Sequence, residues 1–228
     1  MKKINKKIIA GITAAVIIII IAACILIFHV FKDEQAVNQN DENNLGNGIY
    51  IEASEPYTGE FWEDGSGTNV ENIWSLKVIN ASEKDIQYLK IHAKAGGAEG
   101  DFEITTLPAG KELVVLESSA AGYPEESGDI SYDISNLAFF QHELSVMEDR
   151  VTLYGQDNWL KLENTGDQDI SDSVFVYYKN IKDGILQGGI TYRAVFSGGI
   201  PVGESREQEV MHYMQDASQV MYVECGQE

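Results

Sequence analysis

The stretch LKVIN at residues 76–80 returns 84 residues later as LKLEN at residues 160–164, and both copies continue, after four residues, with Asp-Ile. Alternating apolar and polar residues are typical of a half-buried strand, and an asparagine at its end favours a turn. A second landmark, LPAG at residues 107–110, returns as IPVG at residues 200–203 with an offset of 93, so the second copy holds nine more residues. The chain therefore contains an internal repeat of strand, turn and strand.

The same alternation extends outward from the repeat. In the stretch 85–93 the apolar residues Leu89, Ile91 and Ala93 share one face of an extended chain. After residue 32, no segment keeps a helical period for three turns, although the stretch 204–214 comes near. We therefore expect an all-β fold of two tandem β-sandwich domains. Their predicted bounds are 49–143 and 144–228.

At these residues the chain resembles the immunoglobulin-like modules of bacterial surface proteins, particularly the cell-adhesion-related type. Residues 164–166, Asn-Thr-Gly, and the IPVG stretch at 200–203 follow the pattern, and residues 80–82 have Ser in place of Gly. Trp74 and Trp159 depart from it, because they are out of register by one residue. At most one of them can then be the core tryptophan of its unit. The resemblance implies a β-sandwich that binds or spaces molecules at the cell surface, and it implies no catalytic residue.

A membrane anchor is predicted at the N-terminus. Residues 8–31 contain no Asp, Glu, Lys or Arg and follow four lysines in a predicted cytoplasmic tail, residues 1–7. As a helix the segment would be roughly 36 Å long, enough to span a bilayer. The lysines place the N-terminus inside and the later domains outside the cell. Residues 32–48 are rich in Asn, Asp, Gln and Glu and are predicted to form a flexible stalk.

A lipoprotein is the alternative anchor. The stretch IAAC at residues 21–24 resembles the lipobox of bacterial lipoproteins, in which the cysteine, here Cys24, is lipidated. The apolar residues 25–28 that follow it argue against this alternative, because a lipoprotein chain normally becomes polar after the cysteine. Both anchors place the same domains on the outer face.

Charge restricts the partners of the exported part. All 36 acidic residues and 12 of the 16 basic ones follow Phe31, which gives residues 32–228 a formal charge of −24. Such a surface repels nucleic acid and suits a basic partner or divalent cations. Cys225 is the one cysteine after Cys24, so the exported part must fold without an internal disulfide.

No catalytic constellation stands out in the sequence. The stretch GESRE at residues 203–207 lacks the second glycine of a nucleophile elbow. His92, His142 and His212 each stand without a second histidine at the spacing of a metal site. We therefore expect a protein that binds or spaces without catalysis. The alternatives are an accessory subunit of an envelope membrane complex and an envelope hydrolase.

Two groups of residues are candidate sites. Asp167, Asp169 and Asp172 crowd one turn and could bind calcium through hard oxygen ligands, although their spacing is also that of a solvated turn. Calcium is the one cofactor that the composition favours. Tyr57, Phe61 and Trp62 lie in a predicted loop and could bind an unidentified protein or glycan partner. The sequence thus gives a candidate partner-binding group, Tyr57, Phe61 and Trp62, and a candidate calcium group, Asp167, Asp169 and Asp172.

Overall fold

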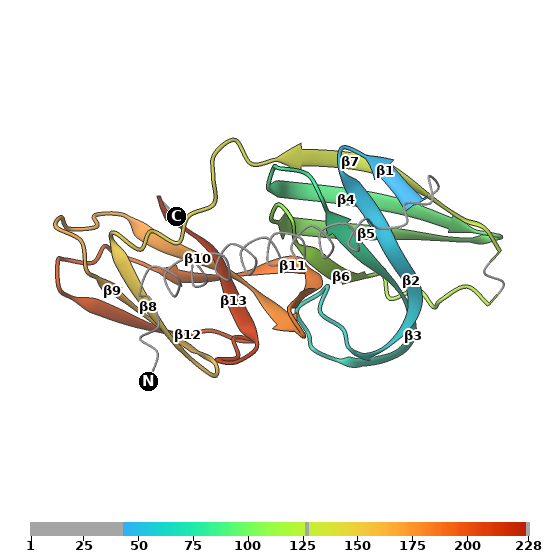
Figure 1. Cartoon of the computed structure of the whole chain (residues 1–228). Coiled ribbons are helices and arrows are strands. Elements are labelled where there is room, and N and C mark those ends of the chain that lie inside the picture. The colour runs from blue at the N-terminus through green and yellow to red at the C-terminus, as the bar shows by residue number, and fades with distance from the viewer. Residues whose placement is uncertain (1–42, 126–127, 227–228) are drawn as a thin grey trace, which may run out of the picture. The chain divides into compact units, whose positions relative to one another are not determined.

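The computed structural model describes residues 43–125 and 128–226 (Figure 1). Residues Glu42–Glu228 form one compact unit. The described ranges contain no helix with the length and hydropathy needed to cross a bilayer.

The predicted N-terminal segments fall mainly outside the described residues. The tail, 1–7, and the membrane helix, 8–31, lie wholly outside them. The last residues of the predicted stalk, 32–48, are described, and there β1 (Asn44–Gly46) pairs with the next strand. Leu45 packs against a hydrophobic core, which explains why the chain is held here. The first strand, Asn44–Gly46, thus lies within the predicted stalk, where the sequence predicted a flexible chain.

The described chain is all-β, as predicted, with thirteen strands and no α-helix. We refer to β1–β7 as the first module and to β8–β13 as the second. After β1, the first module contains β2 (Ile49–Glu60), β3 (Asn69–Asn80), β4 (Ile86–Ala95), β5 (Ala98–Leu107), β6 (Glu112–Leu116) and β7 (Ile130–Phe139). The second contains β8 (Val151–Gln156), β9 (Trp159–Asn164), β10 (Ser173–Lys182), β11 (Ile185–Phe196), β12 (Ser205–Glu209) and β13 (Ser218–Gly226).

The strands form three sheets, and their order repeats between the modules. One sheet has the order β5-β4-β7, another β12-β9-β8, and the largest β1-β2-β3-β6-β11-β10-β13. In the second module β8-β9-β12 corresponds to β2-β3-β6, and β11-β10-β13 corresponds to β5-β4-β7. The repeat found in the sequence is thus also a repeat of strand order, and its layered sheets are consistent with β-sandwiches.

The largest sheet joins the two modules. β6 and β11 pair in parallel, with Leu113 opposite Leu186 and Val114 opposite Gln187. The predicted boundary between residues 143 and 144 falls between β7 and β8, yet the sheet continues from one module into the other (Figure 1). Independent folding of the two modules stays a prediction.

Two main hydrophobic cores are formed, the first mostly by the first module with Leu186, Met221 and Tyr222 of the second, and the other by the second module. Trp74 and Phe102 are fully buried in the first core, where their rings meet edge to face. Leu162 and Val176 are fully buried in the second. Trp159 is 47% exposed, so Trp74 alone is a core tryptophan. A one-residue difference in register places the two indoles on opposite faces of their sheets, because side chains alternate along a strand.

The repeated asparagines confirm the repeat at atomic detail. Asn80 and Asn164 are fully buried at the ends of β3 and β9. Each donates from Nδ2 to the carbonyl oxygen four residues later and to a second carbonyl just before the Pro-x-Gly turn. The acceptors are Lys84 and Leu107 for Asn80, and Gln168 and Ile200 for Asn164, at 2.8–2.9 Å. One side chain thus ties together three segments of its module.

Candidate functional site

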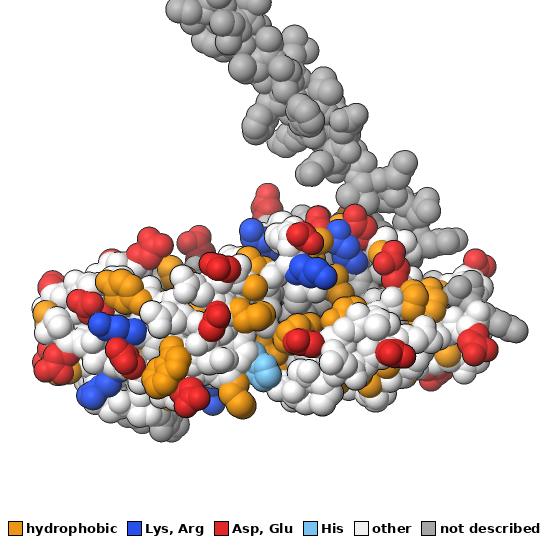
Figure 2. Space-filling view, turned by 90° about the horizontal axis from the view of Figure 1, so that it is seen from below, with side chains coloured by type: hydrophobic (Ala, Val, Ile, Leu, Met, Phe, Trp, Pro, Cys, Tyr) orange, Lys and Arg blue, Asp and Glu red, His pale blue; other side chains and the backbone are white. Residues whose placement is uncertain are grey.

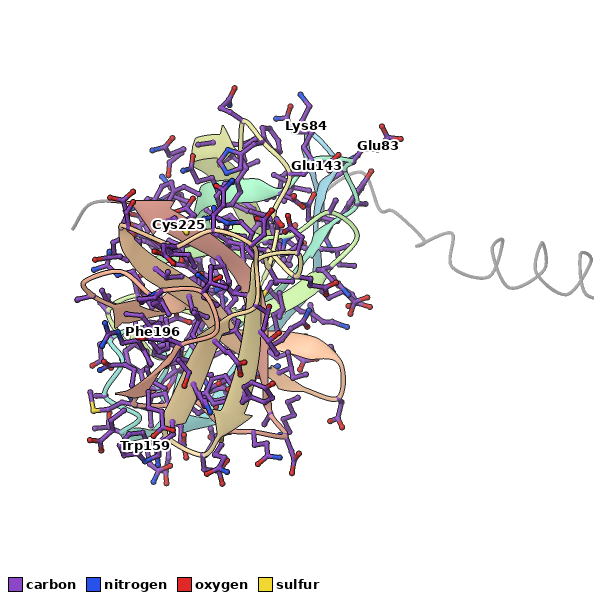
Figure 3. All side chains as sticks on the ribbon, turned by 90° about the vertical axis from the view of Figure 1, so that its left-hand side faces the viewer. Glu83, Lys84, Glu143, Trp159, Phe196 and Cys225 are labelled. Carbon is purple, nitrogen blue, oxygen red and sulfur yellow. The ribbon has the colours of Figure 1, made fainter. Side chains whose placement is uncertain are left out.

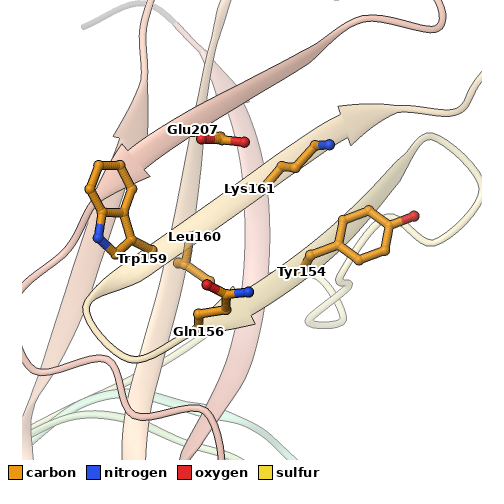
Figure 4. Close-up of a pocket in the computed structure, with 6 residues that line it drawn as sticks. All are labelled: Tyr154, Gln156, Trp159, Leu160, Lys161 and Glu207. Carbon is orange, nitrogen blue, oxygen red and sulfur yellow. The ribbon is translucent and has the colours of Figure 1, made fainter.

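The outer face of the β8-β9-β12 sheet carries the exposed aromatic residues of the second module (Figure 4). Leu160 and Leu162 of β9 point inward and are buried, so Trp159 and Lys161 point outward. Tyr154 on β8 and Trp159 are 52% and 47% exposed. We refer to the outward residues of these strands as the aromatic face. Its members are Thr152, Tyr154, Gln156, Trp159, Lys161, Glu163, Ser205, Glu207 and Glu209.

Lys161 lies at the centre of the aromatic face. It is directly opposite Tyr154 on β8 and Glu207 on β12. Its Nζ atom is 5.8 Å from the centre of the Tyr154 ring, within the range of a cation–π contact. The ammonium group of Lys161 is therefore already engaged within the face.

Trp159 has different neighbours. It is directly opposite Gln156 on β8 and Glu209 on β12. An amide and a carboxylate thus neighbour the indole in the sheet, one on each adjacent strand, and of these two residues Gln156 lines the hollow of the face while Glu209 does not. The face is hollowed, with a volume of about 340 Å³. The hollow is lined by Tyr154, Gln156, Trp159, Leu160, Lys161 and Glu207.

The hairpin that carries the face is held from below. Asn158, in a left-handed conformation in the β8–β9 turn, donates its amide to Tyr213 O at 2.8 Å and accepts from Val210 N at 2.9 Å. The neighbouring Asp157 accepts from Gln215 N at 2.8 Å. Gly155 leaves room for the Tyr213 ring, which a Cβ atom there would overlap. These contacts fix the turn, so the two aromatic rings are presented by a preorganised surface.

The predicted partner-binding residues do not form a free aromatic surface. Phe61 is 5% exposed and belongs to a small hydrophobic cluster with Ile73 and Leu116. Tyr57 donates its hydroxyl to the carbonyl of Glu60. Trp62 lies so close to Gly188 that a Cβ atom there would come within 2.8 Å of the Trp62 Cβ. Tyr57 lies in β2 rather than in the predicted loop, whereas Phe61 and Trp62 lie in the loop after β2, which packs against the second module. Partner binding by Tyr57 and Trp62 stays a prediction.

The three aspartates of the predicted calcium site have separate environments. Asp169 accepts the amide of Val202 at 2.8 Å, and Asp85 does the same for Ala109 in the first module. Asp167 and Asp172 are exposed. Across the described residues, no group of three or more His, Cys, Asp or Glu side chains is placed to hold a metal ion. The structure does not bring these aspartates together, and calcium binding here stays a prediction.

A buried charged pair lies where the modules meet. Four residues of β11, 188–191, bulge out opposite the single residue Lys179 of β10. Lys179 is fully buried, and its Nζ donates to the carbonyls of Gly188, Gly189 and Ile190 at 3.0, 2.8 and 2.7 Å. Three donors thus meet three acceptors, which satisfies the ammonium group.

Glu63 reaches this bulge from the β2–β3 loop of the first module. Its Oε1 atom accepts the amide of Leu116 at 2.8 Å, and Oε2 accepts that of Gly189 at 2.7 Å. Thr105 and Thr191 add a further link, in which the Thr191 hydroxyl donates to Thr105 O at 2.8 Å. Both modules are therefore fixed to one another by the bulge. We refer to Glu63, Lys179 and residues 188–191 as the joint.

Burial sets the protonation of the joint. Burial raises the pKa of Glu63 to about 7. The backbone amide hydrogen bonds and the charge of Lys179 lower this pKa, but their effect is smaller. Burial lowers the pKa of Lys179 to about 7, although the Glu63 charge acts in the opposite direction. Enclosed groups with shifted pKa values can serve in catalysis. Here the donors and acceptors of both side chains are occupied by backbone groups, which indicates a structural role.

Sequence reasoning missed both the aromatic face and the joint. A signal for the face was available, since Trp159 is out of register with Trp74 and must point the other way. A lysine within the apolar run 174–181 and a Gly-Gly pair at 188–189 were signals for the joint. Comparison of the chain with protein-family models, with curated proteins and with solved structures gives no match.

Proposed function

We propose that this protein is a non-catalytic, extracytoplasmic binding protein whose second module binds a glycan on its aromatic face. The observation that carries the proposal is the pair of exposed rings, Tyr154 and Trp159, on a sheet whose β8–β9 turn is held by hydrogen bonds. Exposed aromatic rings in a shallow hollow suit the apolar faces of pyranose rings. Gln156, Lys161 and Glu207 supply polar groups for the sugar hydroxyls.

The proposal includes the anchor and the finer fold. The apolar segment 8–31 would tether the chain, with the lipidated Cys24 as the alternative, and the domains would lie outside the cell. Two immunoglobulin-like β-sandwiches would follow. The joint would keep the second module at a fixed distance from the first, so the protein would also act as a spacer.

Binding is favoured over catalysis by the openness of the face. Tyr154, Trp159 and the whole of β12, Ser205–Glu209, are exposed, so a bound sugar would keep contact with water. General acid–base groups act best where water is excluded and pKa values are shifted. Among the acidic and basic side chains, Glu63 and Lys179 have pKa values shifted to about 7 by burial, and both belong to the joint rather than to the face.

The test is a glycan-binding measurement on the full chain in detergent. A panel of neutral and amino oligosaccharides is screened, and ligands are then titrated calorimetrically. Trp159→Ala should weaken binding at least tenfold, about 1.4 kcal/mol. Met211→Ala is the control, because Met211 is 74% exposed and does not line the hollow. If no oligosaccharide binds, or if both variants lose binding equally, the proposal is wrong.

A further inference from the structure

The aromatic face has an excess of negative charge. Its outward residues on β9 and β12 include Glu163, Glu207 and Glu209, against the single cation Lys161. Lys161 is opposite Glu207 and close to the Tyr154 ring, so one cation stands against three carboxylates on this face. An anionic ligand would therefore meet net repulsion here.

Glu209 is the carboxylate of this face that lies next to the exposed indole of Trp159 in the sheet. Glu209 is directly opposite Trp159, not opposite a lysine or arginine. A cation held above Trp159 would gain a cation–π interaction with the indole and a Coulomb interaction with Glu209. The wider surface has the same sign, and Figure 2 shows one face of the molecule with Asp and Glu side chains spread over it and few Lys or Arg.

The corresponding surface of the first module is different. Its central lysine, Lys77, forms ion pairs with Glu52 and with Glu112, the latter at 2.8 Å. Ser75 stands there at the position equivalent to Trp159, 84 residues earlier. The first module thus has carboxylates that are paired and no exposed indole, so the combination of ring and carboxylate belongs to the second module.

We propose that the ligand is a cationic amino sugar chain, such as oligomers of glucosamine with free amino groups. This inference rests on the proposed function and names its ligand class. The apolar face of an aminopyranose would stack on Trp159 while its ammonium group bonds to Glu209, and the next residue would reach Glu207 and the Tyr154 ring. The repeated cations of such a chain match the two carboxylates, Glu207 and Glu209, on alternate residues of β12.

A basic peptide is the competing cationic ligand, and the face suits it less. β9 is paired on both sides, by β8 and β12, so a peptide could add as a strand only at the outer edge of β8 or of β12, one strand away from Trp159. The shallow hollow also offers no deep recess for a long side chain. Flat rings in an open hollow favour a flat sugar.

The experiment compares two oligosaccharides of equal length, the glucosamine hexamer and the N-acetylglucosamine hexamer, by calorimetry on the full chain at mildly acidic pH. The amino form should bind about tenfold more tightly, and the difference should shrink at high salt. The double variant Glu207→Gln/Glu209→Gln should remove the preference and retain binding of the acetylated form. Trp159→Ala should weaken both.

The matched control removes two charges elsewhere. Glu83 and Glu143 are exposed and lie far from Trp159 in the view of Figure 3, so Glu83→Gln/Glu143→Gln should leave the preference intact. Equal binding of the two hexamers, or equal loss in both double variants, would overturn the amino sugar and leave glycan binding standing. Tighter binding of tetralysine than of the amino hexamer would also overturn it, in favour of a peptide. If neither hexamer nor any other oligosaccharide binds, the proposed function itself fails.

Discussion

Glu63 accepts the backbone amide of Gly189 at 2.7 Å, across 126 residues of chain and from one module to the other. The absence of a side chain at Gly189 makes this approach possible, since a Cβ atom there would collide with the Glu103 carbonyl and crowd the Glu63 carboxylate. The carboxylate also holds Leu116, at the end of β6. The Glu63 side chain thus holds both β6, which pairs with β11 of the second module, and the bulge of β11 at residues 188–191.

The first prediction concerns the pH dependence of stability. The pKa of Glu63 is about 7 in the folded chain, above its ordinary value of 4.5, chiefly because of burial. The folded state therefore binds an extra proton between these values, so the contribution of Glu63 to the free energy of unfolding is full below pH 4.5 and is lost as the pH rises through 7. Urea unfolding should show the difference between wild type and Glu63→Gln falling over this range, on the order of 1 to 3 kcal/mol. A difference independent of pH would contradict the buried carboxyl.

The second prediction compares two lysines. Lys179→Met should lower the free energy of unfolding by about 3 to 5 kcal/mol, because the carbonyls of Gly188, Gly189 and Ile190 lose their donor and the Glu63 carboxylate loses a nearby positive charge. Lys90→Met is the control, since Lys90 pairs with Asp101 and Glu103 on an exposed face and should cost about 0 to 1 kcal/mol. Both variants are measured by denaturant unfolding. Equal losses in the free energy of unfolding would contradict the structural role of the joint.

The repeat, the joint and Trp159 show what the sequence can and cannot predict. The repeat and the strands follow from local alternation and from turn residues, so they were visible in stretches such as 76–80 and 160–164. The joint depends on a bulge and on contacts between residues 63 and 189, whose meeting is decided by how the two modules pack. No local pattern specifies such a long-range approach. Trp159 was different, because its register alone was enough to place it outside the core.

The third prediction tests the repeated asparagines. Asn80→Ala and Asn164→Ala should each lower the free energy of unfolding by about 2 to 3 kcal/mol, since each leaves one buried and one partly buried carbonyl without its donor. Similar costs are expected because the two networks are equivalent. Asn136→Ala, at an exposed position on β7, should change stability by less than about 0.5 kcal/mol. Thermal melts followed by circular dichroism give the comparison, and a neutral Asn164 variant would argue against the shared role.

The fourth prediction separates structure from calcium at Asp169. Asp169→Ala should cost about 1 to 2 kcal/mol, because the amide of Val202 loses its acceptor, and Asp85→Ala should cost a similar amount. The melting temperature of wild type should rise no more with calcium than with sodium chloride of equal ionic strength. A calcium-specific rise that Asp169→Ala abolishes and Asp85→Ala retains would instead establish the predicted metal site at Asp167, Asp169 and Asp172.

The last prediction uses the two tryptophans that the repeat leaves one residue out of register. Trp74 is fully buried against Phe102, and its Nε1 donates to Ser54 Oγ at 2.8 Å, so Trp74→Ala should lower the free energy of unfolding by about 3 to 5 kcal/mol. Trp159→Ala removes an indole that faces water and should change stability by less than about 0.5 kcal/mol. Denaturant unfolding of both variants is measured together with glycan binding. Loss of binding without loss of stability in Trp159→Ala would indicate that the indole serves ligand binding and not the fold. If Trp159→Ala destabilised the chain as much as Trp74→Ala, loss of binding in that variant would reflect unfolding, and the aromatic face would lose its main support as a binding site.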